Sequence, residues 1–493
     1  MLIAILFFQP AFTAPVPPDP KHLLDQAIGV LGGADRLAAL DRWIVEGHGR
    51  ENLTAEFQGR SPEAPTWRDH RESVGVVRSL RRIAWERKTP RNDGSLRWRR
   101  FISGADSSGM VDWTAGLARM RATPTSEADR QGLMRRIPHL LLSELASAPA
   151  ALRSLPSSKG RDVIAVTLPD QAAFTIELDH RHRLVAVEYA VAIAGFGSTV
   201  VRWSWPDWRP DPALAWIPRG HRIAVGGVTY QEVRYSRYQA GVAAADSLVR
   251  VPADPARFAI PLADTAFPSV APPSGPAPGI HLIGVDGFNS LLVEFADFAM
   301  LIEAPASHPG LEAIPASGNP DHARVGRELR RRAEEIAPAK PIRYVVATHH
   351  HDDHLGGLGS FAQPGTTVLV APRHRQTAAK ALAGSRGTAT IETVASMTSI
   401  ADSTRRVEVI RVGNSPHTTD GLVVWLPAER ILFQGDLFYF EPNGPFPPRG
   451  RAIMNGFFAR WLEQRRIEPA AIYGVHSLGA AGPSALSSSR NPW

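Results

Sequence analysis

The stretch Thr348-His349-His350-His351-Asp352-Asp353-His354 contains four histidines and two aspartates within seven residues. A hydrophobic core does not require this composition, because polar side chains are costly to bury unless they find partners. Imidazole and carboxylate groups are, however, good ligands for a borderline divalent cation such as zinc. The stretch is therefore the first candidate for a metal site.

The flanking residues place this stretch on a loop at the end of a strand. Residues 341–347 are apolar and partly β-branched, a pattern typical of a short buried strand. Residues 355–358, Leu-Gly-Gly-Leu, indicate a tight turn into a helix. Sheets of the α/β type usually bind their ligands beyond the carboxyl ends of strands. The polar loop lies where such a fold would carry its site.

Three further candidate ligands lie far along the chain, and each follows a predicted strand. His417 comes shortly after the strand at 406–412, Asp436 after the strand at 431–433, and His476 directly after the strand at 471–475. If these strands end at one edge of their sheets, the three side chains converge on the first loop.

The pattern His349-x-His351-x-Asp353-His354, followed in order by His417, Asp436 and His476, resembles the metallo-β-lactamase superfamily. The resemblance covers approximately residues 280–480. It implies an αββα sandwich with two adjacent metal sites. Carried over to this sequence, it implies a first metal ion held by His349, His351 and His417, a second held by Asp353, His354 and His476, and Asp436 as the ligand that bridges both.

The resemblance also assigns expectations to residues that are not ligands. His350 and Asp352 fall between ligands, so the side chain of His350 should point elsewhere, and Asp352 should fix the loop. Glu303 ends a predicted strand, at a place where the family often has an aspartate that supports the metal loop. A glutamate is one methylene longer at this place.

The ligand types favour zinc and hydrolysis. The chain has no cysteine, whereas closed structural zinc sites often use thiolates. Seven nitrogen and oxygen donors suit two ions with room for water. Family members with two irons typically have glutamate at the place of His351, so the histidine here favours zinc, although iron is still open.

The expected reaction is the attack of a metal-bridging hydroxide on an ester, lactone, lactam or related bond. Asp353 and Asp436 are the expected catalytic residues, and Asp353 could orient the hydroxide or pass a proton to the leaving group. Two alternatives are open: an oxidoreductase of the same fold with a single iron, and a periplasmic ligand carrier whose metal domain is auxiliary.

The substrate is expected to be a small molecule, and its identity depends on loops outside the ligand set. Residues 437–446 are aromatic and Pro-rich, and they either wall a pocket, with Tyr439 or Asn443 as donors, or pack on the surface. Arg373 and His374 follow another predicted strand and could contact an anionic group.

At 493 residues the chain is long enough for two domains, and we predict an α+β two-domain protein. The N-terminal domain, residues 19–263, is mostly antiparallel β. We predict an opening helix at 21–40, a helix at 133–145 and a hairpin at 175–189. The opening helix, the Gly226-Gly227 pair and the meander of strands resemble the half-barrel of periplasmic lipoprotein carriers. A Pro-rich linker at 264–279, the metal domain at 280–480 and a frayed tail at 481–493 complete the predicted organisation.

The N-terminus and the net charge bear on location and partners. Residues 1–18 begin with an apolar run and small residues but lack a basic start, so they form a candidate signal peptide. A periplasmic or secreted location is expected, and a cytoplasmic one is the alternative. The net charge of +7 comes without a nucleic-acid-reading motif, so no nucleic acid partner is expected, and no stable membrane span is predicted. The oligomeric state is open.

Overall fold

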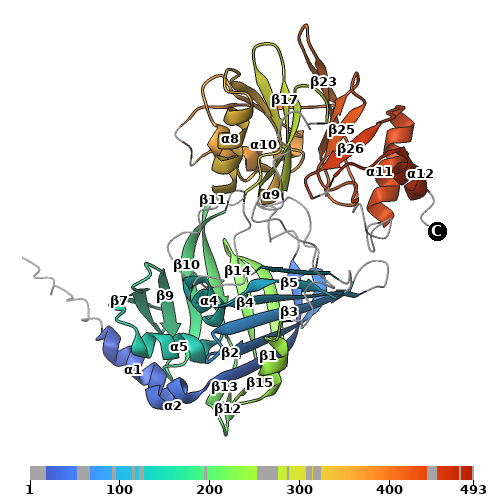
Figure 1. Cartoon of the computed structure of the whole chain (residues 1–493). Helices are drawn as coiled ribbons and strands as arrows, with labels where there is room; N and C mark the ends of the chain where they lie inside the picture. Colours follow the sequence, from blue (N-terminus) through green and yellow to red (C-terminus); the bar gives the residue numbers. More distant parts are fainter. Residues whose placement is uncertain are drawn as a thin grey trace, which may run out of the picture.

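The computed structural model describes residues 18–52, 67–90, 96–113, 117–121, 127–193, 197–251, 276–285, 288–306, 314, 324–383, 385, 387–440, 452–476 and 479–490. The candidate signal peptide up to residue 17 and most of the predicted linker lie outside these ranges. Figure 1 shows a β-rich N-terminal part and a mixed C-terminal part. In the residues described, no helix has both the length and the apolar character to cross a membrane.

The N-terminal part begins with two short helices, α1 (Pro20–Val30) and α2 (Ala34–Ala39). The side chain of Asp19 accepts hydrogen bonds from the first backbone N–H groups of α1, and Pro20 occupies the first turn, where its missing N–H costs nothing. Gly32 and Gly33 have positive φ, which glycine adopts without strain, and they separate the two helices. The helix predicted at 21–40 is therefore confirmed as two helices with a glycine break.

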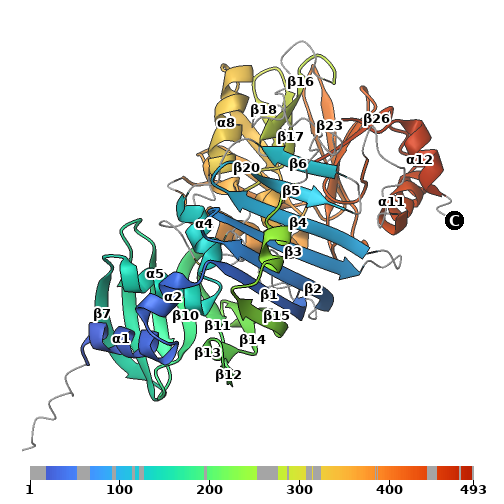
Figure 2. The same cartoon turned by 60° about the horizontal axis from the view of Figure 1, so that its bottom comes forward.

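One antiparallel sheet of thirteen strands dominates this part, and it curves in both views of Figures 1 and 2. Its spatial order is β6-β5-β4-β3-β2-β1-β15-β14-β11-β10-β9-β8-β7. The strands are β1 (Arg42–Asn52), β2 (Trp67–Val77), β3 (Arg82–Pro90), β4 (Leu96–Gly104), β5 (Ser108–Asp112), β6 (Leu117–Arg121), β7 (Ala151–Ser158), β8 (Arg161–Thr167), β9 (Ala173–Leu178), β10 (Leu184–Ile193), β11 (Gly197–Ser204), β14 (Gly220–Val225) and β15 (Val228–Ala240). A small two-stranded sheet pairs β12 (Trp208–Asp211) with β13 (Ala215–Pro218). The predicted hairpin at 175–189 is confirmed as β9–β10.

The helix predicted at 133–145 is wrong in its bounds. The structure has α4 (Glu127–Met134), a break, and then α5 (Pro138–Ser147). Pro138 explains the break, because its ring disfavours helical backbone at the residue before it. Ile137 is accordingly extended, with φ −100° and ψ 109°.

Apolar side chains of α1, α2 and α5 pack on the strands from β8 to β14 to form the main core of this part. Trp203 and Trp205 are fully buried there and Trp208 is nearly so, and all three are therefore packing residues. The short helix α6 (Ala244–Leu248) packs against β2 and β1 with a separate apolar cluster.

A network of polar side chains is also buried in the N-terminal part. The carboxylate of Glu72 accepts hydrogen bonds from Trp85 Nε1 at 3.2 Å and Arg136 Nη2 at 3.3 Å. Burial lowers the pKa values of His70 and His221 to about 4 each, so both rings are neutral near pH 7. Burial would raise the pKa of Glu72, but Arg136 and the two imidazoles outweigh it and hold that pKa at about 2.

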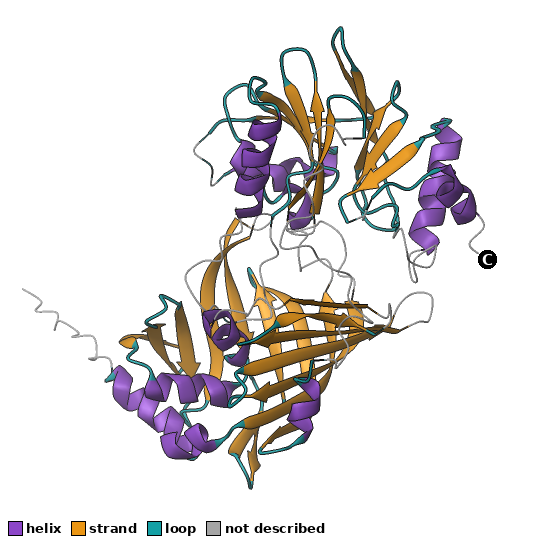
Figure 3. Ribbon diagram, in the orientation of Figure 1, coloured by secondary structure: helices purple, strands orange, loops and turns teal. Residues whose placement is uncertain are grey.

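The C-terminal part consists of two sheets packed face to face (Figure 3). The first contains β16 (Ile280–Val285), β17 (Phe288–Glu294), β18 (Ala299–Ile302), β19 (Ile342–Val346), β20 (Thr367–Val370) and β21 (Thr390–Thr393). The second contains β22 (Met397–Ala401), β23 (Arg406–Arg411), β24 (Leu422–Leu426), β25 (Ile431–Gln434) and β26 (Ala471–Gly474). The strands from β18 to β21 run parallel, as do β25 and β26.

Helices cover the outer face of each sheet. Helices α8 (Arg324–Ile336) and α10 (Arg375–Leu382) share an apolar cluster with the first sheet. Helices α11 (Ala452–Arg465) and α12 (Pro483–Arg490) share another with the second sheet. The layers thus follow the order helix, sheet, sheet, helix, as the sequence resemblance implies.

The prediction of a frayed tail from residue 481 is wrong for the residues described there. Helix α12 packs on α11, with Ala485 and Leu486 each only 8% exposed. The segment is rich in serine and proline, so its composition indicates a loop, whereas contact with α11 buries Ala485 and Leu486 and holds the helix in place.

Candidate metal centre

The histidine-rich loop leaves the end of β19 and enters the one-turn helix α9 (Asp352–Leu355). The segment that follows β18 runs beside it: the N–H of Ala304 donates to the carbonyl of His354, and that of Ala306 donates to Asp352. The loop is also tied to the second sheet, because the N–H of Leu422 donates to the carbonyl of Thr348 at 2.7 Å. Backbone contacts from both sheets therefore fix its course.

Two glycines permit this close packing. A Cβ atom on Gly357 would lie 2.5 Å from the carbonyl oxygen of Pro305, and one on Gly435 would lie 2.3 Å from Thr348 Oγ1. Neither distance is possible for a real side chain without displacement of the Pro305 backbone in the first case or the Thr348 side chain in the second. The Gly-Gly turn predicted after the histidines therefore has a steric reason.

The first group of candidate ligands consists of His349, His351 and His417. His349 Nε2 lies 2.9 Å from His351 Nδ1, and His417 Nε2 lies 3.1 Å and 3.2 Å from these two atoms. Nitrogen ligands about 2.0–2.1 Å from a tetrahedral zinc ion lie roughly 3.3 Å from one another. Three imidazoles from two distant loops thus converge at the spacing that a cation would require.

The second group consists of Asp353, His354 and His476. His476 Nε2 lies 3.1 Å from one carboxylate oxygen of Asp353, and His354 Nε2 lies 3.6 Å from the other. His354 is fully buried, whereas the Asp353 and His476 side chains are 29% and 28% exposed. This group is therefore the more open of the two.

Asp436 lies between the two groups. Its Oδ2 is 3.3 Å from His417 Nε2 in the first group. Its Oδ1 is 3.4 Å from His476 Nε2 and 3.6 Å from His354 Nε2 in the second group. The structure thus brings together all seven residues that the sequence indicated, with the carboxylate of Asp436 divided between two clusters.

Several polar atoms of these clusters are buried without a hydrogen-bond partner among the described residues. They include His354 Nε2 and Asp436 Oδ1, whereas His354 Nδ1 faces Glu303 Oε1 at 3.3 Å. Buried polar atoms normally have a hydrogen-bond partner, so several unpaired atoms in one cluster indicate that a partner is missing. The converging atoms are imidazole nitrogens and carboxylate oxygens, and this donor set fits a divalent cation such as zinc.

Electrostatics at His349 of the first group and at Asp436 favour the protonation states that bind a cation. Burial lowers the pKa of His349 well below its usual value, and the imidazoles of His354 and His351 lower it further. Burial would raise the pKa of Asp436, but the imidazoles of His476 and His354 outweigh it and hold that pKa well below its usual range. Neutral imidazole and ionised carboxylate are the forms that act as ligands.

The second group carries the opposite shift. Burial would lower the pKa of His354, but the carboxylates of Asp353 and Glu303 raise it well above its usual value. Asp353 is held below its usual range because His354 and His476 outweigh the effect of burial on its pKa. The protonated imidazole of His354 and the ionised carboxylate of Asp353 therefore stabilise each other's charge.

Glu303 lies directly behind the second group. Its Oε1 is 3.3 Å from His354 Nδ1, on the side of the ring away from Asp353 and Asp436. Burial raises the pKa of Glu303, although His354 opposes this shift. Glu303 also has a φ of 72°, which is rare for a residue with a side chain and is retained at functional sites. The supporting place expected for Glu303 is the one it occupies.

Two other residues near the loop differ in their outcome. The side chain of His350 points away from the two groups, as expected, and its ring stacks on His374. His374 is buried and donates to a backbone carbonyl rather than facing solvent, so the expectation that it contacts an anionic group finds no support in its placement. The part of the 437–446 loop beyond residue 440, including Asn443, lies outside the described residues.

The sequence reasoning missed Asp420, which is fully buried below the His417 loop. Its carboxylate accepts two hydrogen bonds from Arg411, at 2.7 Å and 3.1 Å. A buried aspartate is rare unless it is paired. Asp420 lies close to His417 in the sequence, and this was the only signal for it. Its partner Arg411 can be identified only from the register of β23.

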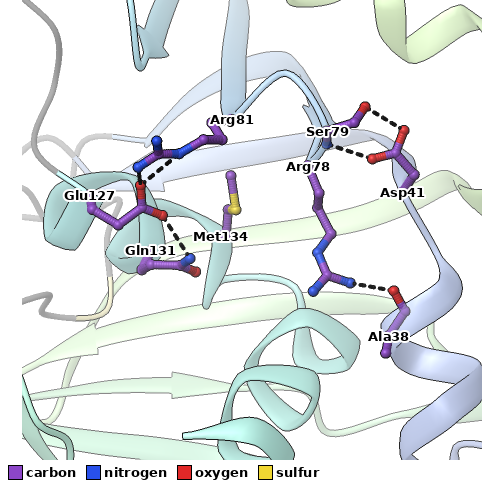
Figure 4. A pocket seen from close by; sticks show the side chains of 8 residues that line it. All are labelled: Ala38, Asp41, Arg78, Ser79, Arg81, Glu127, Gln131 and Met134. Carbon is purple, nitrogen blue, oxygen red and sulfur yellow. Dashed lines mark hydrogen bonds and ion pairs between the residues drawn. The ribbon is translucent and has the colours of Figure 1, made fainter.

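The N-terminal part has a cavity of about 400 Å³ that lies apart from both groups of ligands (Figure 4). Its charged side chains are already paired: Arg81 with Glu127, Asp41 with Ser79, and Arg78 with carbonyls at the end of α2. None of the charged residues that line this cavity therefore lacks a partner that a ligand would have to supply.

Two packed sheets with a cluster of histidine and aspartate at one edge define a class of metal-binding αββα sandwiches. Residues 322–476 match the sequence model of the Metallo-beta-lactamase superfamily, and the C-terminal part of this chain belongs to that superfamily. The match includes all seven candidate ligands.

Solved structures of metallo-beta-lactamases are also similar to the chain. FIM-1 from Pseudomonas aeruginosa, in its mono-zinc form, is 22% identical, covers 42% of this chain and 82% of its own, and has a TM-score of 0.30. The enzyme from Hirschia baltica is 16% identical, with coverages of 43% and 93% and a TM-score of 0.32. The enzyme from Erythrobacter litoralis is 19% identical, with coverages of 43% and 91% and a TM-score of 0.32.

Proposed function

We propose that this protein is a zinc-dependent hydrolase with a dinuclear site. The observation that carries the proposal is the position of Asp436, whose two oxygens lie 3.3 Å and 3.4 Å from histidines of different clusters. A single structural ion would be held by one cluster of ligands, and it would not require a second cluster on the other side of Asp436. Two clusters that share one carboxylate favour two adjacent ions.

The ligand assignment follows the two groups. His349, His351 and His417 would hold the first ion, Asp353, His354 and His476 would hold the second, and Asp436 would bridge them. Two bound divalent ions would lower the pKa of water toward neutrality and polarise the bond under attack. The two aspartates cancel only half the charge of two such ions, so the site favours a substrate group that gains negative charge during the reaction.

The chain itself provides the proton chemistry through Asp353. Its side chain is the most exposed carboxylate of the site, at 29%, whereas Asp436 is 8% exposed. One Asp353 oxygen faces His476 Nε2 at 3.1 Å, which fixes the carboxylate at the open side of the cluster. Asp353 is therefore placed to accept a proton from the attacking water and return it to a leaving group. Carbonyl substrates such as esters, lactones and lactams suit this arrangement.

Metal analysis of the full chain, purified without added metal, tests the proposal. About two zinc ions per chain together with turnover of an ester, lactone or lactam support it. One iron per chain would favour the oxidoreductase alternative. Turnover that persists after both ions are removed with a chelator would contradict the proposal. Exposed Asp297 provides a control, since Asp297→Asn removes a carboxylate from the turn between β17 and β18 that precedes the opposite end of β18 from Glu303.

The ligand-carrier alternative attributes the function to the N-terminal part. It predicts that a hydrolase screen with zinc finds no substrate, while an apolar ligand co-purifies with the full chain. Substrate turnover that is lost in His351→Ala, with the N-terminal part still folded, would argue against it.

We further propose export directed by residues 1–18, and sequencing of the mature N-terminus from periplasmic protein tests this.

A further inference from the structure

His374 lies between the two loops that present the first group, although it belongs to neither. It ends the short 3₁₀ helix η2 (Pro372–His374) after β20, and it is 4% exposed. One face of its ring stacks on His350, with centroids 4.5 Å apart and planes inclined by 21°. Its Nε2 lies 2.7 Å from the carbonyl oxygen of Asp420. Because a carbonyl can only accept, Nε2 carries the proton and donates.

Asp420 makes this hydrogen bond a link to the loop of His417. Besides the two hydrogen bonds from Arg411, its carboxylate accepts one from the backbone N–H of Arg373 at 3.4 Å. Its carbonyl also accepts a hydrogen bond from Thr418 Oγ1 at 2.8 Å, next to His417. The acceptor that holds His374 is thus anchored from three directions.

His350 makes the stacking contact a link to the other loop. The residue is 4% exposed, and both its ring nitrogens lack a hydrogen-bond partner among the described residues. Its ring therefore contributes shape and contact area rather than hydrogen bonds. It is flanked by His349 and His351, so a shift of the His350 ring moves the backbone that carries both candidate ligands.

We propose that His374 is a positioning residue for the first metal ion. It holds the loop of His349 and His351 against the loop of His417, so that the three nitrogens keep separations of 2.9–3.2 Å. This inference rests on the proposed function. Its physical basis is that the hydrogen bond to Asp420 fixes the plane of the His374 ring, and the ring plane fixes His350.

The second group provides an internal reference, because the stacking of His374 on His350 and its hydrogen bond to Asp420 link the loops that carry the first group. A residue that only stabilised the fold would weaken both metal sites together. A positioning residue for the first ion should weaken that site alone. Removal of a group that orients ligands typically lowers metal affinity by about 10–100-fold.

The experiment measures zinc affinity in the metal-free full chain by competition with a chromophoric chelator. In a His476→Ala background, which disables the second group, His374→Ala should raise the Kd for zinc by about 10–100-fold. In a His417→Ala background, which disables the first group, the same substitution should leave the Kd unchanged. Cobalt(II) as a second probe should show weaker visible bands in the first background, because the bands depend on tetrahedral geometry.

Two conservative variants separate the contacts. His374→Gln keeps an N–H donor without the ring, and His374→Phe keeps the ring without the donor. Each should lose less zinc affinity than His374→Ala, and Gln376→Ala on the exposed side of the following helix should lose none. If His374→Ala does not fold, as judged by circular dichroism of the metal-free chain, the Gln and Phe variants carry the test.

Unchanged zinc affinity of His374→Ala in the His476→Ala background would overturn the inference while the proposed function stands. An equal loss of affinity in both backgrounds would also overturn it, because it would show a general effect on the fold. Failure of the wild-type chain to bind zinc at all would instead remove the proposed function, and the inference with it.

Discussion

Glu303 Oε1 lies 3.3 Å from Nδ1 of His354, and both side chains are completely buried. The other nitrogen of the same ring faces Asp353 and Asp436. The imidazole therefore lies between a carboxylate that can orient it and the place where the second ion is proposed to bind. Such an arrangement fixes the ring and makes its free nitrogen a better ligand.

Replacing Glu303 should weaken the second metal site. We expect Glu303→Ala to lower zinc affinity there by about 10–100-fold, since the His354 ring loses its orienting partner. Glu303→Gln should lose less, because its amide oxygen can still accept a hydrogen bond. Zinc titration in a His417→Ala background measures the effect. Glu334→Gln, at an exposed position of α8, is the control, and wild-type affinity in Glu303→Ala would contradict the role.

Replacing Asp436 should abolish turnover. Asp436→Ala removes the only carboxylate that faces both clusters among the described residues, so we expect activity to fall by at least about 10³-fold. Bound zinc should fall from about two ions to one or fewer. Steady-state rates and metal analysis on the same preparation check this, with Asp297→Asn as control. Full activity in Asp436→Ala would rule out the bridging assignment.

The N-terminal part should lose stability as the pH falls from 6.5 toward 4. Burial holds the pKa values of His70, His139 and His221 at about 4, whereas unfolded histidines titrate near 6.5. In this window the unfolded chain binds more protons, so acid favours unfolding, by up to about 1.4 kcal/mol per pH unit for each histidine. Glu72 adds its own loss only below about pH 4.5, since its pKa is lowered to about 2.

Urea unfolding of the full chain at pH 7.5 and pH 5, followed by tryptophan fluorescence, measures this dependence. A His221→Gln variant should show a shallower loss of stability over the same interval, because one titrating group is gone. The opposite result, a His221→Gln variant with the same pH dependence as the wild type, would show that this ring is not buried neutral.

Ile314 should couple the two parts of the chain. Its N–H donates to the carbonyl of Gly132 at 3.1 Å, and its side chain is fully buried in the N-terminal core, although it follows β18 in sequence. Truncation to alanine leaves a cavity, and we expect Ile314→Ala to cost about 2–5 kcal/mol of unfolding free energy in the N-terminal part. Denaturant unfolding detects this. A matched Ile453→Ala change at an exposed position, 51% accessible, should have little effect.

The convergence of the seven candidate ligands could be predicted from sequence, because each of them lies next to a strand whose apolar pattern is local. Position after a strand end is enough to bring His417, Asp436 and His476 to one edge. The stacking of His374 on His350 could not be predicted, since it depends on how two loops pack. Helix α12 was missed because its serine-rich sequence has weak helical character, and only docking on α11 stabilises it. The helix break at Pro138 was readable, since proline restricts the residue before it.

The last candidate ligand, His476, follows the final strand of the second sheet, and β26 reaches its place only by pairing in parallel with β25. A nascent chain still short of this point on the ribosome holds six of the seven donors but lacks the strand that delivers the seventh. In the proposed two-ion site, complete loading would therefore require that β26 has already paired with β25. For an exported chain, the metal would be acquired in the compartment where folding ends.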